Sequence, residues 1–370
     1  MIILDIVFYI FIVVVCIQVI FNLFLFSNFS FSKENKTNSN QVPVSIIICA
    51  KNEADNLKEF LPSIICQNYP TFEIVLINDA SNDDTLEVME SFSARYKNIR
   101  IVNVKNVEAF WGNKKYALTL GIKVAQYDHL LFTDADCRPV SENWIDEMCA
   151  QFTETKTIVL GYGAYNKIKK SILNKLIRYE TLLTAMYYFS FAKIGLPYMG
   201  VGRNLAYKKS EFFNNNGFMS HIKIRSGDDD LFINQIATAQ NTSICATKNS
   251  FTQSLPKTNF KDWLNQKRRH ISTAKHYKVK HKILLSLLYI TQLLFWVLAS
   301  ILFVFSFKWH IVLALFSSKL LIDYIIVGFS AKKLNETDTI LLLPFLQLFL
   351  LLIQLTIFIS NLFLKPSHWK

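Results

Sequence analysis

The sequence predicts an α/β domain with a mostly parallel central sheet flanked by helices, joined at both ends to transmembrane helices. Three observations lead to this prediction: strand-like and helix-like segments alternate through the middle of the chain, polar residues follow the strand ends, and long apolar runs occupy both ends. Strands that alternate with helices are typical of parallel sheets covered on both faces. With 51% hydrophobic and 18% charged residues, the 370-residue chain fits neither an ordinary soluble protein nor a pure membrane bundle.

Apolar runs define the ends of the chain. Those long enough to cross a bilayer are residues 6–26, 283–305, 311–329 and 340–364. The first has neither a basic start nor a small-residue cleavage site, so we expect a retained anchor and not a signal peptide. We therefore expect five segments: an N-terminal transmembrane anchor (1–27), a polar linker (28–42), a central domain (43–257), an interfacial amphipathic helix region (258–282) and a C-terminal region with two to three transmembrane helices (283–370).

Basic residues predict the orientation, because cytoplasmic flanks carry an excess of Lys and Arg. Lys33 and Lys36 follow the first run, and Gln266-Lys267-Arg268-Arg269 stands before the second. We expect a multi-pass protein of a bacterial inner membrane with its central domain in the cytoplasm. Lys365 and Lys370 would then lie outside, which leaves the C-terminal topology open. The net charge of +12, without a nucleic-acid-binding motif, predicts anionic membrane lipids as partners and no nucleic acid.

The central domain is predicted element by element. Runs rich in Ile, Val and Leu predict strands over 44–50, 72–77, 99–104 and 129–133. The stretches between them predict helices over 53–66, 83–96 and 113–125. Sheets of this kind bind ligands beyond the carboxyl ends of their strands. The polar residues that follow these ends are Lys51, Asn52, Glu53, Asp79, Asp134 and Asp136.

Asp134-Ala135-Asp136 directly follows the strand that begins at His129. On an extended strand, residues two apart point the same way, so the two carboxylates would repel each other unless a cation lies between them. Mg²⁺ and Mn²⁺ prefer such oxygen ligands and commonly bring phosphate oxygens with them. The alternative is a pair of solvated turn aspartates.

Seven short motifs stand in a fixed order through the middle of the chain. They are Ser45-Ile-Ile-Ile-Cys-Ala-Lys-Asn-Glu53, Ile77-Asn-Asp-Ala-Ser-Asn-Asp83, Gly112-Asn-Lys-Lys-Tyr-Ala-Leu118, Thr133-Asp-Ala-Asp-Cys-Arg-Pro139, Gly202-Arg-Asn-Leu-Ala-Tyr207, Gly227-Asp-Asp-Asp-Leu231 and Gln266-Lys-Arg-Arg-His270. Together they resemble glycosyltransferase family 2, in its membrane-anchored, synthase-like branch. The resemblance spans about residues 45–275 and implies the nucleotide-sugar-binding GT-A fold.

The resemblance implies how a nucleotide-sugar donor is held. Glu53 and Asp79 correspond to the nucleoside contacts, and Lys114 to a lysine that neutralises phosphate. Asp136, with Asp134 as a second ligand or nucleotide contact, corresponds to the Mg²⁺ or Mn²⁺ site. Asn78 stands where the family often has a second acid, which leaves the base contact open. The alternatives are that Asp79 caps a turn and that Lys114 is a solvated helix charge for which Lys115 could substitute.

Asp229 corresponds to the general base of the family. An acceptor hydroxyl must lose its proton as it attacks the anomeric carbon, and the family reacts with inversion. Asp228 replaces the usual glutamate. Three adjacent aspartates leave the assignment open by one position, and their mutual repulsion would raise the pKa of one of them. The alternative is an exposed acidic turn.

The segment Gln266 to His270 resembles the family motif Q-x-x-R-W, which closes over the donor. The resemblance implies that Arg269 contacts phosphate and Gln266 the donor or acceptor, while His270 replaces the tryptophan of the acceptor site. The alternative is an interfacial amphipathic helix, on which we expect Lys267 and Arg268 to face the membrane. Arg203 and Asn204, together with Asp228 and His270, are the predicted acceptor-side residues, although Gly202 before them may serve only a turn.

Lys319 and Asp323 lie within an apolar run at i, i+4 spacing, and we expect them to pair with each other. The whole pattern predicts an inverting, metal-dependent transfer of a sugar from a nucleoside-diphosphate sugar, with a UDP-sugar favoured, to a glycan or lipid acceptor at the cytoplasmic face. The runner-up is transfer to a polyprenyl phosphate or another lipid alcohol. The alternative of another class is a non-catalytic nucleotide-sugar-binding or scaffold protein of the membrane.

Overall fold

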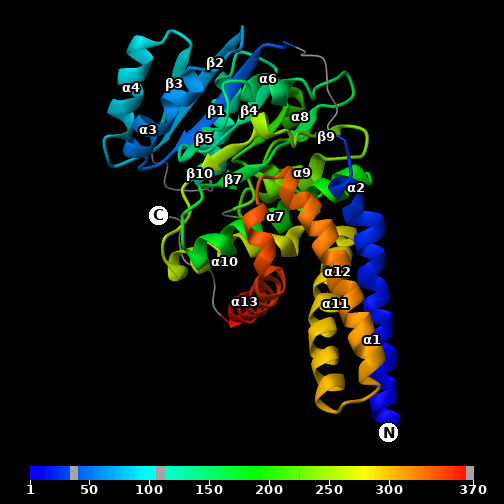
Figure 1. Ribbon diagram of the computed structural model, residues 1–370. Helices are drawn as coiled ribbons and strands as arrows, with labels where there is room; N and C mark the ends of the chain where they lie inside the picture. Colours follow the sequence, from blue (N-terminus) through cyan, green and yellow to red (C-terminus); the bar gives the residue numbers. More distant parts are fainter. Residues whose placement is uncertain (34–40, 106–112, 225, 364–370) are drawn as a thin grey trace. The chain divides into compact units, whose positions relative to one another are not determined.

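The computed structural model describes residues 1–33, 41–105, 113–224 and 226–363, which form two compact units (Figure 1). The sheet unit comprises the described residues of Glu34–Lys169 and Gly195–Lys257. The membrane unit comprises Met1–Lys33, Lys170–Ile194 and the described residues from Thr258 onward, so a segment expected in the central domain groups with the membrane helices. The positions outside the described residues include 34–40 of the predicted linker, Gly112 of the third motif, Lys365 and Lys370.

A seven-stranded sheet in the order β3-β2-β1-β4-β8-β6-β9 forms the centre of the sheet unit. β1 to β4 run parallel, whereas β8 runs antiparallel to both β4 and β6, so the predicted mostly parallel sheet is confirmed. A smaller sheet has the order β5-β10-β7. The strands are β1 (Val44–Ala50), β2 (Phe72–Asp79), β3 (Ile99–Val104), β4 (His129–Phe132), β5 (Cys137–Pro139), β6 (Ile158–Leu160), β7 (Gly163–Tyr165), β8 (Leu205–Lys208), β9 (Thr242–Ile244) and β10 (Thr252–Ser254).

Helices cover both faces of the large sheet. Alternate residues of β1 and β2, such as Ile46 and Leu76, pack against α3, α4 and α6. α5 packs on the opposite face, where its Gly121 lies so close to Ile77 of β2 that a Cβ would clash. The helices of this unit are α3 (Ala54–Ile65), α4 (Thr85–Arg95), α5 (Asn113–Val124), α6 (Trp144–Cys149), α8 (Lys209–Asn214) and α9 (Asp230–Ile236).

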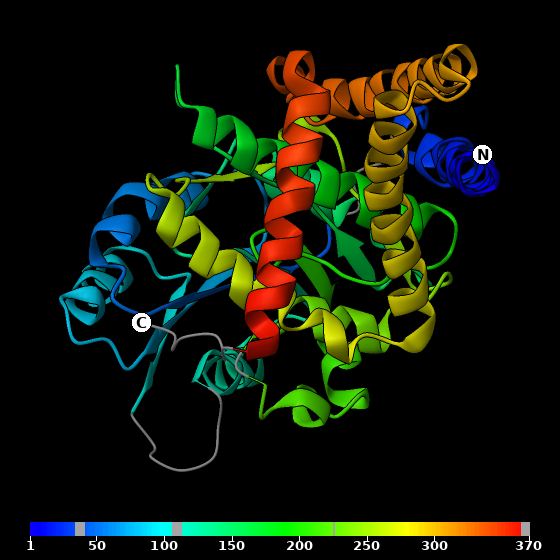
Figure 2. The same cartoon turned by 90° about the horizontal axis from the view of Figure 1, so that it is seen from below.

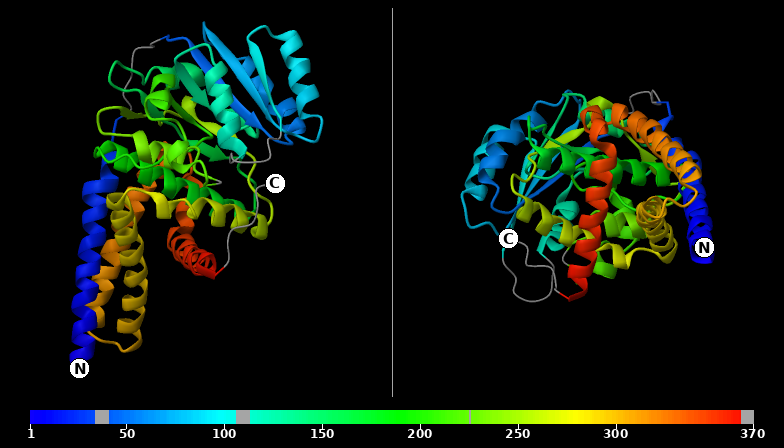
Figure 3. Two further views of the ribbon diagram at one scale, coloured as in Figure 1. Left: turned by 180° about the vertical axis from the view of Figure 1, so that it is seen from behind. Right: turned by 60° about the horizontal axis from the view of Figure 1, so that its bottom comes forward.

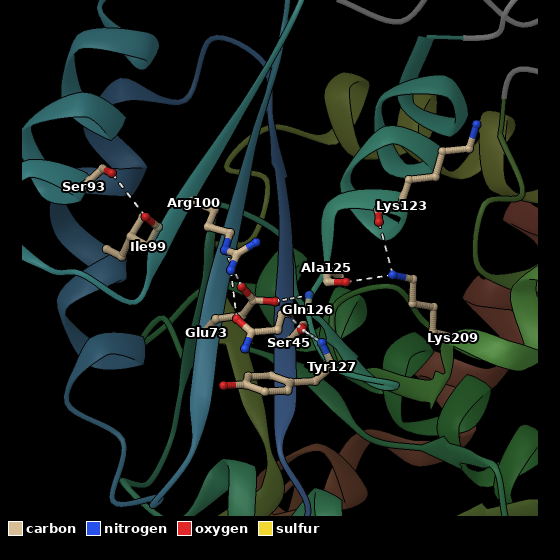
Figure 4. A network of polar contacts seen from close by, with 10 residues as sticks. All are labelled: Ser45, Glu73, Ser93, Ile99, Arg100, Lys123, Ala125, Gln126, Tyr127 and Lys209. Carbon is tan, nitrogen blue, oxygen red and sulfur yellow. Dashed lines mark hydrogen bonds and ion pairs between the residues drawn. The ribbon is translucent and has the colours of Figure 1, made fainter.

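A buried polar network holds the amino ends of the first strands together, at the edge opposite their carboxyl ends (Figure 4). Glu73 of β2 accepts hydrogen bonds from Ser45 Oγ at 2.6 Å and from the Gln126 amide at 2.5 Å. Arg100 of β3 pairs with the other carboxylate oxygen at 3.0 Å. Because a buried charge is tolerated only when it is paired and hydrogen-bonded, this network fixes the starts of three strands relative to one another.

The membrane unit contains, within its described residues, four helices long and apolar enough to cross a membrane. They cover Ile2–Ser30, Val279–Val304, Trp309–Lys333 and Thr337–Asn361, close to the four predicted runs. α1, α11 and α12 run side by side around a shared apolar core that includes Phe11 (Figures 2 and 3). The elements are α1 (Ile2–Ile20), the π-helix η1 (Phe21–Phe26), α2 (Ser27–Ser30), α11 (Val279–Val304), α12 (Trp309–Lys333), the short η5 (Thr337–Leu342) and α13 (Leu343–Phe363).

Lys319 and Asp323 pair within α12, as expected. Lys319 Nζ lies 2.6 Å from Asp323 Oδ2, and both side chains are buried. Asn22 of the π-helical turn donates to the other oxygen of Asp323 at 3.0 Å, and Gln347 of α13 donates to Oδ2 at 3.3 Å. The ion pair therefore joins η1, α12 and α13 through polar contacts within the candidate spans.

Two helices that are not candidate spans complete the membrane unit, α7 (Ile172–Lys193) and α10 (Phe260–Ile271). Lys267 Nζ of α10 lies 2.5 Å from Glu180 Oε2 of α7, and Arg268 Nε donates to Asn361 Oδ1 of α13 at 3.1 Å. Lys267 and Arg268, which we expected to face the membrane, therefore both bind partners inside the unit.

Candidate active site

Several predicted site residues gather at one edge of the large sheet. β1 pairs in parallel with both β2 and β4, so the loops that follow these strands reach the same edge. A small cleft lies there, formed by segments that are far apart in the sequence. Its polar lining consists of Cys49, Lys114, Thr133, Asp134, Gly202, Tyr207, Asp228 and Asp229.

Asp134 and Asp136 converge through a turn and not along an extended strand. β4 ends at Phe132, and the amide of Cys137 donates to the carbonyl of Asp134 at 3.1 Å, which closes a turn around Ala135. The expected strand geometry of the pair is therefore wrong. The turn nevertheless brings a carboxylate oxygen of each aspartate and the sulfur of Cys137 within 4.8 Å of one another.

The electrostatics of this turn favour a bound cation. Burial, and then the charge of Asp134, raise the pKa of Asp136 above its usual range. Burial also raises the pKa of the Cys137 thiol, which donates to Asp136 Oδ1 at 3.4 Å as a neutral group. Two carboxylates therefore remain as hard oxygen ligands, a donor set that fits Mg²⁺ or Mn²⁺.

Lys114 bridges two carboxylates from different loops. Its Nζ lies 2.8 Å from Asp134 Oδ1 and 3.3 Å from Asp228 Oδ2. Burial alone would lower the pKa of Lys114, but the charges of Asp134 and Asp228 outweigh it, so the pKa is raised and the ammonium group stays charged. These contacts rule out the alternative that Lys114 is a solvated helix charge.

Asp229 is held by two backbone N–H groups. The amide of Gly202 donates to Oδ2 and the amide of Asp230 donates to Oδ1, each at 2.7 Å. A Cβ on Gly202 would lie 3.4 Å from that Oδ2, so Gly202 contacts the carboxylate directly and does more than make a turn. Burial, and then the charges of Asp228 and Asp230, raise the pKa of Asp229 to about 7. A carboxylate with that pKa is suited to accept a proton near neutral pH.

Lys115 has a role that the sequence did not suggest. Its side chain is 1% exposed, and its Nζ donates to the carbonyls of His221, Ile224 and Ser226, each at 2.8 Å. Lys115 therefore cannot substitute for Lys114, because all three of its N–H donors bind the loop before Gly227. Carbonyl acceptors leave no side-chain signature in the sequence, so no motif could have indicated this contact.

Asn204, a predicted acceptor-side residue, is enclosed by the fold. It is fully buried, its amide donates to the carbonyls of Tyr162 and Ser250, and its Oδ1 accepts from Trp144 Nε1 at 3.0 Å. These contacts join the residue before β8 to the β6–β7 connection, to the short turn Lys248–Ser250 and to α6. Any effect of Asn204 on an acceptor would be transmitted through the packing around it.

Arg203, the other residue of that pair, lies near the Asp134–Asp136 turn. Its Nη1 donates to the carbonyl of Ala164 and to Ser254 Oγ, each at 2.9 Å, and its guanidinium lies 4.2 Å from the centre of the Tyr165 ring. The positive charge of Arg203 opposes the rise in the pKa of Asp136. Arg203 therefore acts on the carboxylate turn, and its acceptor-side role stays a prediction.

Glu53 and Asp79, the predicted nucleoside contacts, lie beyond the ends of β1 and at the end of β2. Burial is the main cause that raises the pKa of each. The charges of Asp136 and Asp134 add to the rise for Glu53, which therefore lies near the carboxylate turn. Beside Asp79, a second and more open hollow is lined by residues that include Asn78, Asp83 and Asn103. Asn78 Nδ2 donates to Asn103 Oδ1 at 2.9 Å in this hollow.

The remaining predicted residues lie in the membrane unit. Gln266, Arg269 and His270 stand on α10, whose N-terminus is capped by Asn259 accepting from the Asp262 amide at 2.9 Å. Trp263 is fully buried on this helix, and burial lowers the pKa of Arg269. The part of these three residues in holding a donor or acceptor stays a prediction.

Comparison with known protein families identifies the domain. The model of the family described as glycosyl transferase family 2 matches residues 45–213, which include β1, the Asp134–Asp136 turn and the Gly202 segment. The central domain belongs to glycosyl transferase family 2. The match begins at the strand that precedes Glu53 and ends before Asp228 and Asp229.

Curated relatives of this family 2 domain share about 30% identity over limited segments. Glycosyltransferase AglE of Haloferax volcanii is 29% identical over 120 residues, which cover 32% of this chain and 38% of that protein. Poly-beta-1,6-N-acetyl-D-glucosamine synthase of Staphylococcus epidermidis is 31% identical over 93 residues, which cover 25% of this chain and 21% of that protein. The chain therefore matches less than half the length of these relatives.

The fold of the family 2 protein has a solved counterpart. The mannosyltransferase PcManGT of Pyrobaculum calidifontis, solved in complex with GDP-Man and Mn²⁺, superposes with a TM-score of 0.58 over 89% of this chain and 98% of its own. The sequence identity is 16%, so this likeness concerns the fold alone. It supports the GT-A assignment made from the motifs.

Proposed function

We propose that this family 2 protein is an inverting, metal-dependent glycosyltransferase. It moves a sugar from a nucleoside-diphosphate sugar, a UDP-sugar in the first instance, to a glycan or lipid acceptor at the cytoplasmic face of the membrane. The observation that carries the proposal is the cleft in which Lys114 bridges Asp134 to Asp228, next to Asp229 with its pKa of about 7. Such a transfer needs a cation site and a proton acceptor close together, and here Asp134 of the carboxylate turn and Asp229 line the same cleft.

The donor side would be formed by Asp134 and Lys114, which line the cleft, and by Asp136, which lies beside Asp134 in the same turn. The two carboxylates would hold Mg²⁺ or Mn²⁺, which neutralises the diphosphate as it leaves. Lys114 adds a second positive charge in the same place, already held by Asp134 at 2.8 Å. Glu53 and Asp79 would accept hydrogen bonds from the nucleoside. The GDP-Man and Mn²⁺ bound to the solved mannosyltransferase support a nucleotide sugar with a divalent cation.

Asp229 would take the proton of the acceptor hydroxyl. The acceptor oxygen forms a bond to the anomeric carbon, the bond from that carbon to the phosphate oxygen breaks, and its electron pair leaves with the nucleoside diphosphate. One displacement of this kind inverts the configuration. The amides of Gly202 and Asp230 keep the carboxylate in a single orientation, so that its position does not depend on the acceptor.

The membrane unit would place the reaction at the cytoplasmic face of a bacterial inner membrane. In the sequence, basic residues follow the first candidate span and precede the second, which supports a positive-inside orientation and anionic lipids as neighbours. Gln266 and Arg269 of α10 would contact the donor and His270 the acceptor. A lipid acceptor would reach the site from the same face.

A donor panel tests the proposal. Full-length protein in lipid nanodiscs is given UDP- and GDP-sugars with Mg²⁺ or Mn²⁺ and a bacterial membrane-lipid and glycan extract as acceptor, and nucleoside diphosphate release is followed. We expect release with one donor class, loss of release with EDTA, and a product whose anomeric configuration is inverted by NMR. No release with any donor would contradict the proposal, and retention of configuration would refute the single displacement.

A further inference from the structure

The loop before the aspartates is anchored by one lysine. Between the short helix η2 (Met219–His221) and Gly227, the structure describes residues 221–224 and 226, and Lys115 Nζ binds the carbonyls of His221, Ile224 and Ser226 at 2.8 Å each. An ammonium group has three donors, so every one is used. Because the side chain is only 1% exposed, water cannot replace these bonds without opening the fold.

The exit from this loop is fixed as well. Gly227 has a φ of +95°, a conformation that L side chains rarely adopt, and a Cβ there would lie 2.5 Å from Leu231 Cδ1. The left-handed backbone of Gly227 therefore sets the direction in which the chain continues from Ser226 to Asp228 and Asp229. Asp229 follows the last anchored carbonyl by three residues, so movement of the loop would move its carboxylate.

The helix that carries Lys115 is itself held at both ends. Lys209 Nζ donates to the carbonyls of Lys123 and Ala125 at 3.1 and 2.7 Å, at the C-terminal end of α5 (Figure 4). Neighbouring helix residues point about 100° apart, so Lys114 and Lys115 at the other end reach different targets. Lys114 contacts the carboxylates of the cleft, and Lys115 contacts the loop behind them.

We propose that Lys115 is a positioning residue for the catalytic base: it holds the backbone carbonyls of His221, Ile224 and Ser226 and thereby fixes the place of Asp229 relative to Lys114 and Asp134 in the cleft. The inference rests on the proposed function of Asp229. The two adjacent lysines therefore have different roles. Lys114 neutralises the charge of the donor, whereas Lys115 determines the position of Asp229. Loss of the Lys115 contacts should therefore impair turnover and leave donor binding intact.

Lys115→Met tests this division, because Met is similar in length but donates no hydrogen bond. We expect kcat for nucleoside diphosphate release to fall on the order of 10²-fold, the effect of about 1 Å of misplacement. The KM for the donor and the Kd for UDP with Mn²⁺, measured by calorimetry, should stay within about twofold because Lys114, Asp134 and Asp136 are unchanged. Limited trypsin cleavage after Lys223 should become faster, since the loop around this exposed residue loses its anchor.

Two further variants keep the test decisive. Lys123→Met removes an exposed lysine from the same helix and should match the native protein in every readout. Lys115→Arg keeps a cation with donors and should recover part of kcat and of the trypsin resistance. Native kcat and native cleavage in Lys115→Met would overturn the inference. So would equal loss of UDP–Mn²⁺ binding and of kcat in both Lys115 variants, because that result means a role in folding only.

Comparing native protein with Lys115→Met distinguishes a failure of this inference from a failure of the proposed function. If native protein releases no nucleoside diphosphate from any donor, the proposed function fails and the inference fails with it. If native protein is active and Lys115→Met is equally active, only the inference fails. Unchanged donor binding with slow turnover and a protease-sensitive loop would support both.

Discussion

The acid limb of the pH–rate profile tests Asp229 as the base. A general base works only when it is deprotonated, so activity must fall below its pKa. Burial and the charges of Asp228 and Asp230 raise the pKa of Asp229 to about 7. We therefore expect kcat/KM to be level above about pH 8 and to fall about tenfold for each pH unit below 7. At pH 6 the rate should be about a tenth of the plateau value.

Asp228→Asn should move this limb in a known direction. Removing the negative charge of Asp228 removes the largest charge contribution that holds the pKa of Asp229 up. The limb should therefore move to lower pH by on the order of one unit, and activity at pH 6 should rise toward the plateau of the variant. The plateau itself should drop, because Lys114 loses a partner at 3.3 Å.

The assay is nucleoside diphosphate release between pH 5 and 9 in a constant-ionic-strength buffer, with the donor identified by the panel. Lys123→Met, an exposed change on α5, is the control and should leave the limb in place. The reasoning is refuted if Asp228→Asn leaves the limb at its native position or moves it to higher pH. It is also refuted if Asp229→Asn keeps the native limb.

Three more predictions follow from single contacts. Lys114→Met removes the positive charge beside Asp134, so the affinity for UDP with Mn²⁺ should fall about tenfold or more in calorimetry, and unchanged affinity would argue against a phosphate contact. Gly227→Ala forces an L residue to φ +95° and should lower stability by about 1–3 kcal/mol in thermal unfolding, whereas Gly328→Ala, whose Cβ meets nothing within 4 Å, should not. Arg178→Met leaves Glu336, 2% exposed, without its ion pair and should destabilise the protein by about 3–5 kcal/mol, against about 0.5 kcal/mol or less for Lys58→Met at the exposed pair with Asp55.

The elements of the sheet unit are predictable because their signals are local. β1 and β3 occur at the predicted bounds 44–50 and 99–104, since runs of Ile and Val between polar residues fit a buried strand and little else. The candidate spans agree with the apolar runs for the same reason. The pairing of Lys319 with Asp323 follows from helix periodicity alone.

Features that depend on distant partners could not be predicted. The strand pattern shows where β4 ends but not that the chain turns at Asp134, because that turn depends on one backbone hydrogen bond to Cys137. Lys115 binds a carbonyl that lies 106 residues away in the sequence. The run of basic residues predicted that Lys267 faces the membrane. Its partner Glu180 lies on a separate helix, and a run of charges in the sequence does not reveal such a pair.

The most direct test of the central claim measures binding and turnover in the same preparation of native protein and Asp229→Asn. Calorimetry follows binding of Mn²⁺ with the nucleoside diphosphate of the native donor, and product release follows transfer. We expect Asp229→Asn to bind this nucleotide within about twofold of native protein and to lose transfer by about 10³-fold or more. Native transfer rates in Asp229→Asn would contradict the account, and so would loss of nucleotide binding together with transfer.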